Sequence, residues 1–169
     1  MPSALFRRVN LDYLYGPFLE KALDVIADCQ AAGREYWASL GFRTWAEQDD
    51  LYAKGRALPG HIVTEAKGGD SAHNYGLAID FVAQKAGIPT AQVFLPDWGP
   101  ACYDLLGHTA LLRGLVWGGS WTAFPDRPHI QWPGFVTATD LAPLRVAYES
   151  TNGATLDKLR AVWAIVDRM

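Results

Sequence analysis

The sequence predicts a single domain of the α+β class, in which helices and short strands share one core. The length of 169 residues suits one domain, and no internal repeat or Pro/Ser-rich linker divides it. Half of the residues are hydrophobic and one fifth are charged, as in globular proteins. Helical periodicity marks both ends of the chain, whereas the strand-like segments are short. We therefore expect residues 1–169 to fold as one unit.

The first two elements are predicted from apolar spacing. Hydrophobic residues recur at intervals of three and four over residues 10–32, which indicates an amphipathic helix that Gly33 can end. Residues 34–42 carry aromatic side chains and a closing Gly-Phe pair, which suit a short strand.

A capping box marks the next helix. Thr44 is followed three residues later by Glu47, so we expect a helix to begin there and to run to about Lys54, where Gly55 ends it. Arg43 then lies at a strand-to-helix corner, which is a rigid place from which to aim a side chain.

The middle of the chain is predicted as a long ordered loop followed by a strand. Residues 55–72 are rich in glycine, and loops of this length inside a domain are usually functional. The apolar segment AIDFV, residues 78–82, is typical of a strand. His73 lies between the loop and this strand.

Two strands and three helices are predicted in the second half. LVW at 115–117 reads as a strand that breaks into a turn, and HIQW at 129–132 as another. The first helix covers 97–113, and its expected apolar side is Leu105, Leu106, Leu111 and Leu112. Helices over 139–149 and 154–168 close the chain.

Charge and hydropathy exclude two classes of partner. The net charge is −3 and the longest basic run is the pair Arg7 and Arg8, so nucleic acid is not expected to bind. The N-terminal segment lacks the apolar core of a signal peptide, and no segment is long enough for a membrane span. We expect a monomer that is made in the cytoplasm. Cys29 and Cys102 are expected to be buried, reduced thiols.

Two segments concentrate the side chains that carry chemistry, SAHNYGLAID at 71–80 and WGGSWTAFPDRPHIQ at 117–131. Their His73, Asp80 and His129 make three ligands, the number in a catalytic zinc site whose fourth position is open to water. Asp80 has apolar neighbours and would be a costly buried carboxylate unless a cation met it. The alternative is that these are polar residues of the core.

Hydrolysis also needs a carboxylate that is not a ligand, to move a proton from water to the leaving amine. Asp126, three residues before His129, is the candidate, although PDRP is also turn sequence. Arg43 is the candidate for stabilising an oxyanion or holding a substrate carboxylate, unless it pairs with Glu47.

Three further residues are weaker candidates for substrate contact. Ser71 either contacts substrate or braces the loop. Trp117 and Trp121 flank the GGS turn, where they either line the substrate cleft or pack in the core.

These segments resemble a known family. SAHNYGLAID fits the pattern SxHxxGxAxD, and WGGSWTAFPDRPHIQ is similar to the WGGDW and acid-to-His segment of zinc peptidases that cut peptidoglycan stems. Those enzymes are D-alanyl-D-alanine carboxypeptidases and dipeptidases, and the L-alanyl-D-glutamate endopeptidases of bacteriophages. GFRTWAEQDDLYAKGR looks like their GYRS-type segment, and PGHIVTEAKGGDSAHNYGLAIDF resembles the phage branch. The resemblance covers about residues 40–132 and leaves the helical tail, about 138–169, without a counterpart.

The resemblance implies roles by position. It implies one zinc ion per chain and a catalytic acid/base at Asp126, with substrate contacts from Arg43 and Ser71. The implied zinc ligands are His73, Asp80 and His129. Many relatives carry Glu as the acid/base, and Ser120 stands where WGGDW has an acid.

The implied fold is the small α+β one shared with the hedgehog signalling domain, an antiparallel sheet with helices packed on one side. The implied function is hydrolysis of the peptidoglycan stem, at the L-alanyl-D-glutamate bond, by a phage or prophage endolysin that reaches the wall after release from the cytoplasm. A D-alanyl-D-alanine carboxypeptidase is the nearer alternative, and a wall-binding module that keeps zinc without catalysis is the more remote one.

Overall fold

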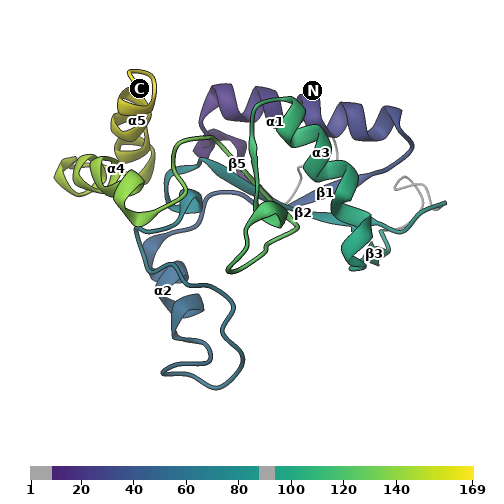
Figure 1. Ribbon diagram of the computed structural model, residues 1–169. Helices are drawn as coiled ribbons and strands as arrows, with labels where there is room; N and C mark the ends of the chain where they lie inside the picture. Colours follow the sequence, from purple (N-terminus) through teal and green to yellow (C-terminus); the bar gives the residue numbers. More distant parts are fainter. Residues whose placement is uncertain (1–8, 88–93) are drawn as a thin grey trace.

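The structure is a computed structural model that describes residues 9–87 and 94–169 (Figure 1). The pair Arg7 and Arg8, and the first half of the segment 1–16 in which no signal peptide was expected, lie outside the described residues. Among the described residues, no helix combines the length and the apolar character needed to cross a bilayer.

Helices and short strands alternate along the chain. The α-helices are α1 (Gly16–Ala31), α2 (Trp45–Ala53), α3 (Asp104–Leu112), α4 (Ala138–Ser150) and α5 (Thr155–Val166). The strands are β1 (Tyr36–Leu40), β2 (Ala78–Gln84), β3 (Pro96–Asp97), β4 (Val116–Trp117) and β5 (His129–Gln131). Short 3-10 helices are η2 (Leu11–Tyr13), η3 (Ala72–Tyr75), η4 (Pro100–Tyr103) and η5 (Gly118–Ser120).

The N-terminal helix begins later than the apolar spacing predicted. Residues 10–32 divide into η2 and α1, with Tyr15 extended between them. Pro17 occupies the first turn of α1, where the fixed φ of proline and its missing N–H favour a helix start. Gly33 follows α1 with φ of 80°, in the left-handed region that commonly ends helices.

The second helix confirms its capping box. The Thr44 side chain accepts from the Glu47 backbone N–H, and the Glu47 carboxylate accepts from the Thr44 backbone N–H at 2.8 Å. Together they satisfy two backbone donors at the start of α2. Gly55 adopts φ of 71° just after the helix, as predicted.

The sheet is antiparallel throughout, with the order β1-β2-β5-β4 and with β3 also paired to β2. Side chains alternate across it, so Ile79 and Phe81 face one side and Asp80 the other. The register pairs Ile79 with Ile130 and Asp80 with His129. One face of the sheet is therefore apolar, and the opposite face carries the polar site residues.

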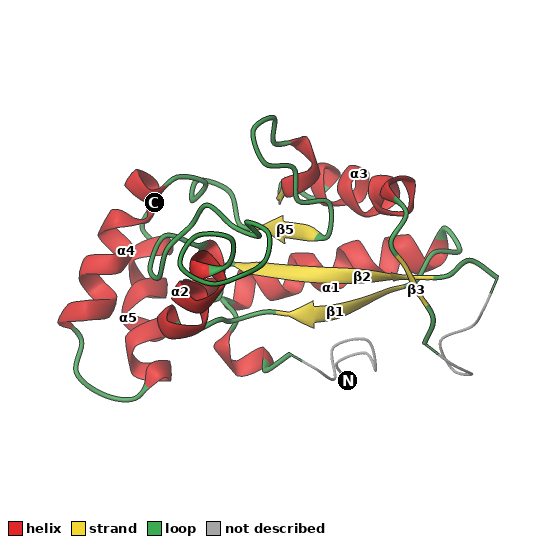
Figure 2. Cartoon of the chain, turned by 90° about the horizontal axis from the view of Figure 1, so that it is seen from below, coloured by secondary structure: helices red, strands yellow, loops and turns green. Residues whose placement is uncertain are grey.

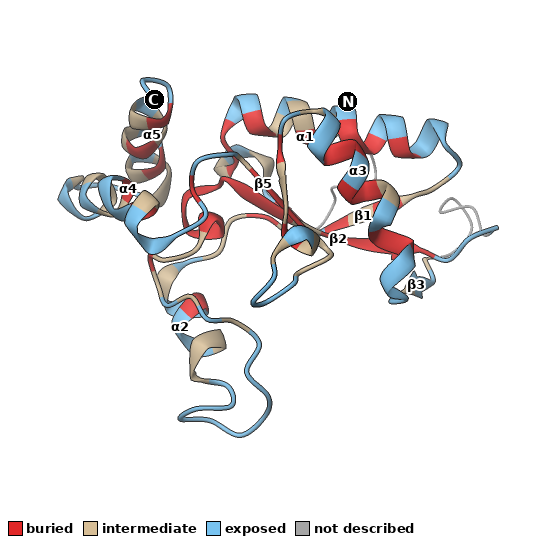
Figure 3. Cartoon of the chain, in the orientation of Figure 1, coloured by how far each residue is buried: buried red, intermediate tan, exposed pale blue. Residues whose placement is uncertain are grey.

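The core forms between the apolar face of the sheet and the helices α1 and α3 (Figures 2 and 3). Phe18 and Ile26 of α1 are buried in the same hydrophobic cluster as Phe81 of β2. Both cysteines are free and buried, as predicted. The α+β class and the small antiparallel sheet are confirmed; α2 and the C-terminal helices lie at the end of the sheet where β2 begins.

The predicted helix 97–113 is too long, and only part of its predicted apolar side, Leu105 and Leu106, packs against the core. Residues 96–103 form β3 and η4, and α3 begins only at Asp104. Leu111 and Leu112 are 50% and 73% exposed, whereas the buried side is Leu106, Gly107, Thr109 and Ala110. The reason is contact with Trp117: a Cβ on Gly107 would lie 2.2 Å from its indole, so only glycine allows this close packing.

The two C-terminal helices dock onto the rest of the molecule, as the periodicity of the last one predicted. Leu159, Val162 and Val166 of α5 are buried. The Trp163 indole N–H donates to the Tyr75 carbonyl at 2.9 Å, two residues after His73. The tail is thus tied to the segment that carries a candidate ligand.

Candidate metal centre

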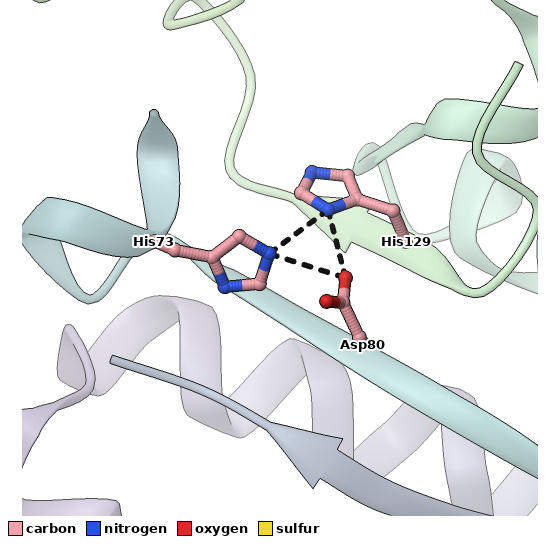
Figure 4. A group of neighbouring side chains, drawn as sticks. All are labelled: His73, Asp80 and His129. Carbon is pink, nitrogen blue, oxygen red and sulfur yellow. Dashed lines mark hydrogen bonds and ion pairs between the residues drawn. The ribbon is translucent and has the colours of Figure 1, made fainter. Parts of the chain in front are cut away.

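Three side chains from separate segments converge at the polar face of the sheet (Figure 4). The His73 Nε2 atom lies 3.1 Å from Asp80 Oδ1 and 3.1 Å from His129 Nδ1. The His129 Nδ1 atom lies 3.0 Å from the same Asp80 oxygen. This is the group that the sequence predicted as ligands.

The motif SAHNYGLAID explains how His73 and Asp80 meet. Residues 72–75 form η3, and Gly76 then turns the chain with φ of 68° into β2. A Cβ at Gly76 would collide with the Tyr13 carbonyl, so glycine is required there. This turn places His73 next to β2, the strand that contains Asp80.

The sheet register places Asp80 beside His129. The two residues are partners in the antiparallel pair of β2 and β5, so their side chains leave the same face. Next to them the pairing of β1 with β2 is irregular between Ala38 and Leu40, as is common near active sites. Rigid strands thus fix two of the three candidate ligands.

Hydrogen bonds to the outer ring nitrogens settle the tautomer of both imidazoles. His73 Nδ1 lies 2.7 Å from the Gly41 carbonyl, which can only accept, so this nitrogen carries the hydrogen. His129 Nε2 lies 2.9 Å from Gln131 Oε1. The Gln131 amide donates to the Phe135 carbonyl at 2.8 Å, which orients the oxygen toward His129.

Two nitrogen lone pairs and a carboxylate oxygen therefore face one another within hydrogen-bond distance. Three acceptors in a buried position repel unless a cation lies among them, either a proton or a metal ion. Burial by itself raises the pKa of Asp80. Without a metal, the charge of His73 and the hydrogen bonds from both imidazoles outweigh burial, and the pKa of Asp80 is lowered. Hydrogen bonding and charge from Asp80 likewise outweigh burial and raise the pKa of His129.

The donor set fits zinc. Two neutral imidazoles whose other nitrogen donates a hydrogen bond, together with one carboxylate, form the three-residue shell of catalytic zinc sites. Bound there, zinc would supply Lewis-acid chemistry to water and to a substrate carbonyl. Because protons compete for the same nitrogens, metal affinity should fall as the pH decreases.

The three residues lie in the wall of a cavity of about 380 Å³. Arg43, Ser71, Asp126 and Trp121, all predicted from the sequence, are among the other residues that line it. The lining also includes the exposed apolar side chains Val63, Phe124 and Val136, and further polar residues such as Asp70. The cavity therefore offers both apolar and polar contacts to a ligand.

Asp126 faces this cavity from a turn held by Gly118. Its backbone N–H donates to the Gly118 carbonyl at 2.9 Å, and a Cβ on Gly118 would lie 2.5 Å from the Asp126 carbonyl oxygen. Burial raises the pKa of Asp126, and the Asp80 charge adds to this, against the opposing effect of His129, His73 and Arg43. A carboxyl group of raised pKa beside the candidate ligands suits proton transfer.

Arg43 points at the candidate ligands rather than at Glu47. Its Nη2 atom lies 3.8 Å from Asp80 Oδ2, and Nη1 donates to Gln48 Oε1 at 2.7 Å. Glu47 is engaged in the capping box. Burial lowers the pKa of Arg43, although the charges of Asp80, Asp126 and Glu47 oppose the shift.

The two tryptophans have different surroundings. Trp121 lines the cavity, and its ring centroid is 5.1 Å from that of His129. For Trp117, the candidate role in substrate contact gives way to the alternative of core packing: its indole packs on Gly107 and donates to the Arg127 carbonyl at 2.8 Å, outside the cavity lining. Its position in the β4 strand, which turns it toward α3, is the physical reason.

Sequence reasoning missed two glutamines. Gln131 orients His129, and the signal for it was available, because residues two apart on a strand share a face. Gln48 is fully buried and joins Arg43 to the long loop through the Ala66 carbonyl, 2.8 Å from its amide nitrogen. No local pattern in the sequence distinguishes Gln48 from a solvent-facing helix residue.

Replacing Gln131 should weaken metal binding without removing a ligand. In Gln131→Met the side chain keeps its size but loses the acceptor for His129 Nε2–H, so we expect zinc affinity to fall by about 10- to 100-fold. Gln131→Glu keeps an acceptor for His129 but loses the donor to the Phe135 carbonyl, so it should retain more zinc affinity than Gln131→Met without matching the parent. Competition with a chromophoric chelator measures both, and equal affinity of Gln131→Met and the parent chain would contradict this role.

Comparison with known proteins agrees with the geometry. Two family models, both described as D-alanyl-D-alanine carboxypeptidase, match residues 64–132 and 13–94. The peptidoglycan L-alanyl-D-glutamate endopeptidase CwlK of Bacillus subtilis is 38% identical over 125 residues, which cover 72% of this chain and 68% of the relative.

Two solved structures are similar at lower identity. The L-Ala D-Glu endopeptidase ChiX of Serratia marcescens is 23% identical, with a TM-score of 0.48, over 73% of this chain and 83% of that one. A variant of the vancomycin resistance D,D-pentapeptidase VanY, solved with Zn(II), is 16% identical, with a TM-score of 0.51, over 87% and 83%. The latter likeness concerns the fold alone. On the family models and the Bacillus subtilis relative, the chain belongs to the family of peptidoglycan peptidases that contains D-alanyl-D-alanine carboxypeptidases and L-alanyl-D-glutamate endopeptidases.

Proposed function

We propose that the chain is a zinc metallopeptidase that hydrolyses the peptide stem of bacterial peptidoglycan at the L-alanyl-D-glutamate bond. The observation that carries this proposal is the convergence of His73, Asp80 and His129 in a cavity that also holds Asp126, a carboxylate outside the three. Similarity to the Bacillus subtilis endopeptidase supports the choice of bond.

Each residue of the site has a separate role in the proposed hydrolysis. Asp126 accepts a proton from the attacking water and returns it to the leaving amine, for which its raised pKa is suited. Arg43 donates to the oxygen that becomes negative, or to a carboxylate of the substrate. Ser71 and Trp121 lie in the cavity wall, where they contact the peptide. His73, Asp80 and His129 would hold the zinc ion, one per chain.

Peptidoglycan digestion tests the choice of bond. Purified protein loaded with zinc should release new amino termini of D-glutamate from purified peptidoglycan. Release of D-alanine alone would replace the proposal with a D-alanyl-D-alanine carboxypeptidase, which the descriptions of both family models favour. Zinc binding without any cleavage product would instead leave a non-catalytic wall-binding module, a function that has no use for Asp126.

We further propose a phage or prophage endolysin, which acts as a monomer, is made in the cytoplasm and reaches the wall after a membrane pore forms. Support comes from the similarity of residues 59–81 to the phage branch of the family. Lysis that depends on co-expression of a pore-forming protein is the expected result. Lysis without a pore would contradict this route.

A further inference from the structure

We propose that Arg145, on α4, is a positioning residue for the cavity wall, which it holds through the segment Gly68–Ser71. Asp70 and Ser71 of this segment line the cavity, and His73 follows two residues later. Both family models end at or before residue 132, so α4 lies beyond them. The effect on substrate rests on the proposed function, whereas the effect on the segment does not.

A single guanidinium nitrogen makes both contacts. Arg145 Nη2 donates to the Gly68 carbonyl at 3.0 Å and to Asp70 Oδ1 at 2.6 Å. The side chains of Arg145 and Asp70 are only 36% and 25% exposed, so solvent weakens this pair less than an ion pair on the open surface. One side chain thus ties the backbone and an acidic side chain of the wall to α4.

The chain passes close beneath the guanidinium at Gly69. This residue has φ of 83°, and a Cβ added to it would lie 2.8 Å from Arg145 Nη2. Its carbonyl accepts from the Tyr75 hydroxyl at 2.9 Å, and its N–H donates to Asn74 Oδ1 at 2.9 Å. The segment is therefore held by Arg145 on one side and by the motif that carries His73 on the other.

Aromatic packing fixes Arg145 itself. Its guanidinium carbon lies 5.6 Å from the centroid of the Trp45 ring, within the range of a cation–π contact. Trp45 stacks on Tyr148, three residues along α4, with centroids 5.1 Å apart and an interplanar angle of 21°. The aromatic rings therefore help to hold the guanidinium in the orientation in which it contacts the wall.

The consequence concerns substrate binding more than the chemical step. The candidate ligands are oriented by other groups, Gly41 for His73 and Gln131 for His129. Arg145 makes its hydrogen bonds to Gly68 and Asp70 instead. Loss of Arg145 should release the wall at Asp70 and Ser71 and leave the metal site in place. A change confined to substrate binding appears as a rise in KM with kcat retained.

Three variants test this role: Arg145→Gln, Arg145→Lys and Arg160→Gln. Arg160 is an exposed arginine on α5 whose nearest acid, Asp157, lies 3.8 Å away, which makes it a matched control. In Arg145→Gln we expect faster amide hydrogen exchange at residues 68–71, unchanged zinc content, and KM raised about tenfold with kcat within about twofold of the parent. Arg145→Lys should recover part of the change, and Arg160→Gln should match the parent.

Two results would contradict the role of Arg145. Unchanged exchange and unchanged KM in Arg145→Gln would overturn it. So would a parallel loss of zinc, kcat and thermal stability that Arg145→Lys does not relieve, because that pattern marks a purely structural residue. If the parent chain cleaves no peptidoglycan, the proposed function fails, and hydrogen exchange at 68–71 still decides whether Arg145 holds the wall.

Discussion

The His73→Ala variant is expected to fold, to purify without zinc and to show no hydrolysis of peptidoglycan. The substitution removes one of three donors, and the two that remain cannot complete the three-residue shell of a catalytic zinc site. It also leaves the Gly41 carbonyl without its partner, a loss of about 1–3 kcal/mol of stability if water does not replace the bond. Metal analysis of the purified protein measures the first effect directly.

A thermal titration separates loss of metal from loss of fold. At zinc concentrations of about 100 times the dissociation constant, a ligand stabilises the native state by about 2.7 kcal/mol, so the parent should melt at a higher temperature with zinc. His73→Ala should not respond. His108→Ala is the matched control, because His108 is exposed on α3 and should respond as the parent does. A His73→Ala protein that keeps one zinc ion would remove His73 from the site.

The sequence predicted which candidate ligands lie together better than it predicted the bounds of the helices. His73 and Asp80 were predictable as neighbours because one motif holds the turn, the required glycine and the strand. His129 is far away in sequence, and it was joined to them by the number of ligands in a catalytic zinc site and by the family resemblance, not by a local pattern. The register that pairs it with Asp80 depends on contacts across the sheet, which no local pattern specifies.

The errors also have local causes. Apolar spacing alone extended the first helix through Tyr15 and the third one back to residue 97, although Pro17 and Pro100 favour helix starts at those places. Trp117 was a candidate for substrate contact because it flanks the GGS turn, whereas its strand turns the indole toward Gly107. The contact of Arg145 with the cavity wall could not be predicted from the sequence, because Arg145 and Asp70 are 75 positions apart.

The Asp126→Asn variant is expected to keep its zinc and its fold and to lose activity by a factor on the order of 100 to 10,000. Asparagine has nearly the same shape, but it cannot accept a proton from water. The Gly118 contact to the backbone of Asp126 is retained, so the turn should not move. Asp126→Glu keeps a carboxylate one methylene longer and should retain more activity than Asp126→Asn. Unchanged kcat/KM in Asp126→Asn would remove this residue from the mechanism.

Asp126→Asn should also stabilise the metal-free protein, and this stabilisation should increase as the pH rises. Burial raises the pKa of Asp126 in the folded state, so the native protein binds this proton more tightly than the unfolded chain does. The parent therefore loses stability as the pH rises from the unfolded pKa, about 3.9, through the raised folded value. Asparagine does not ionise, so Asp126→Asn should match the parent below this window and exceed it above. Urea unfolding of both metal-free proteins across this range measures the difference, and an advantage of the variant that shrinks as the pH rises would contradict the raised pKa.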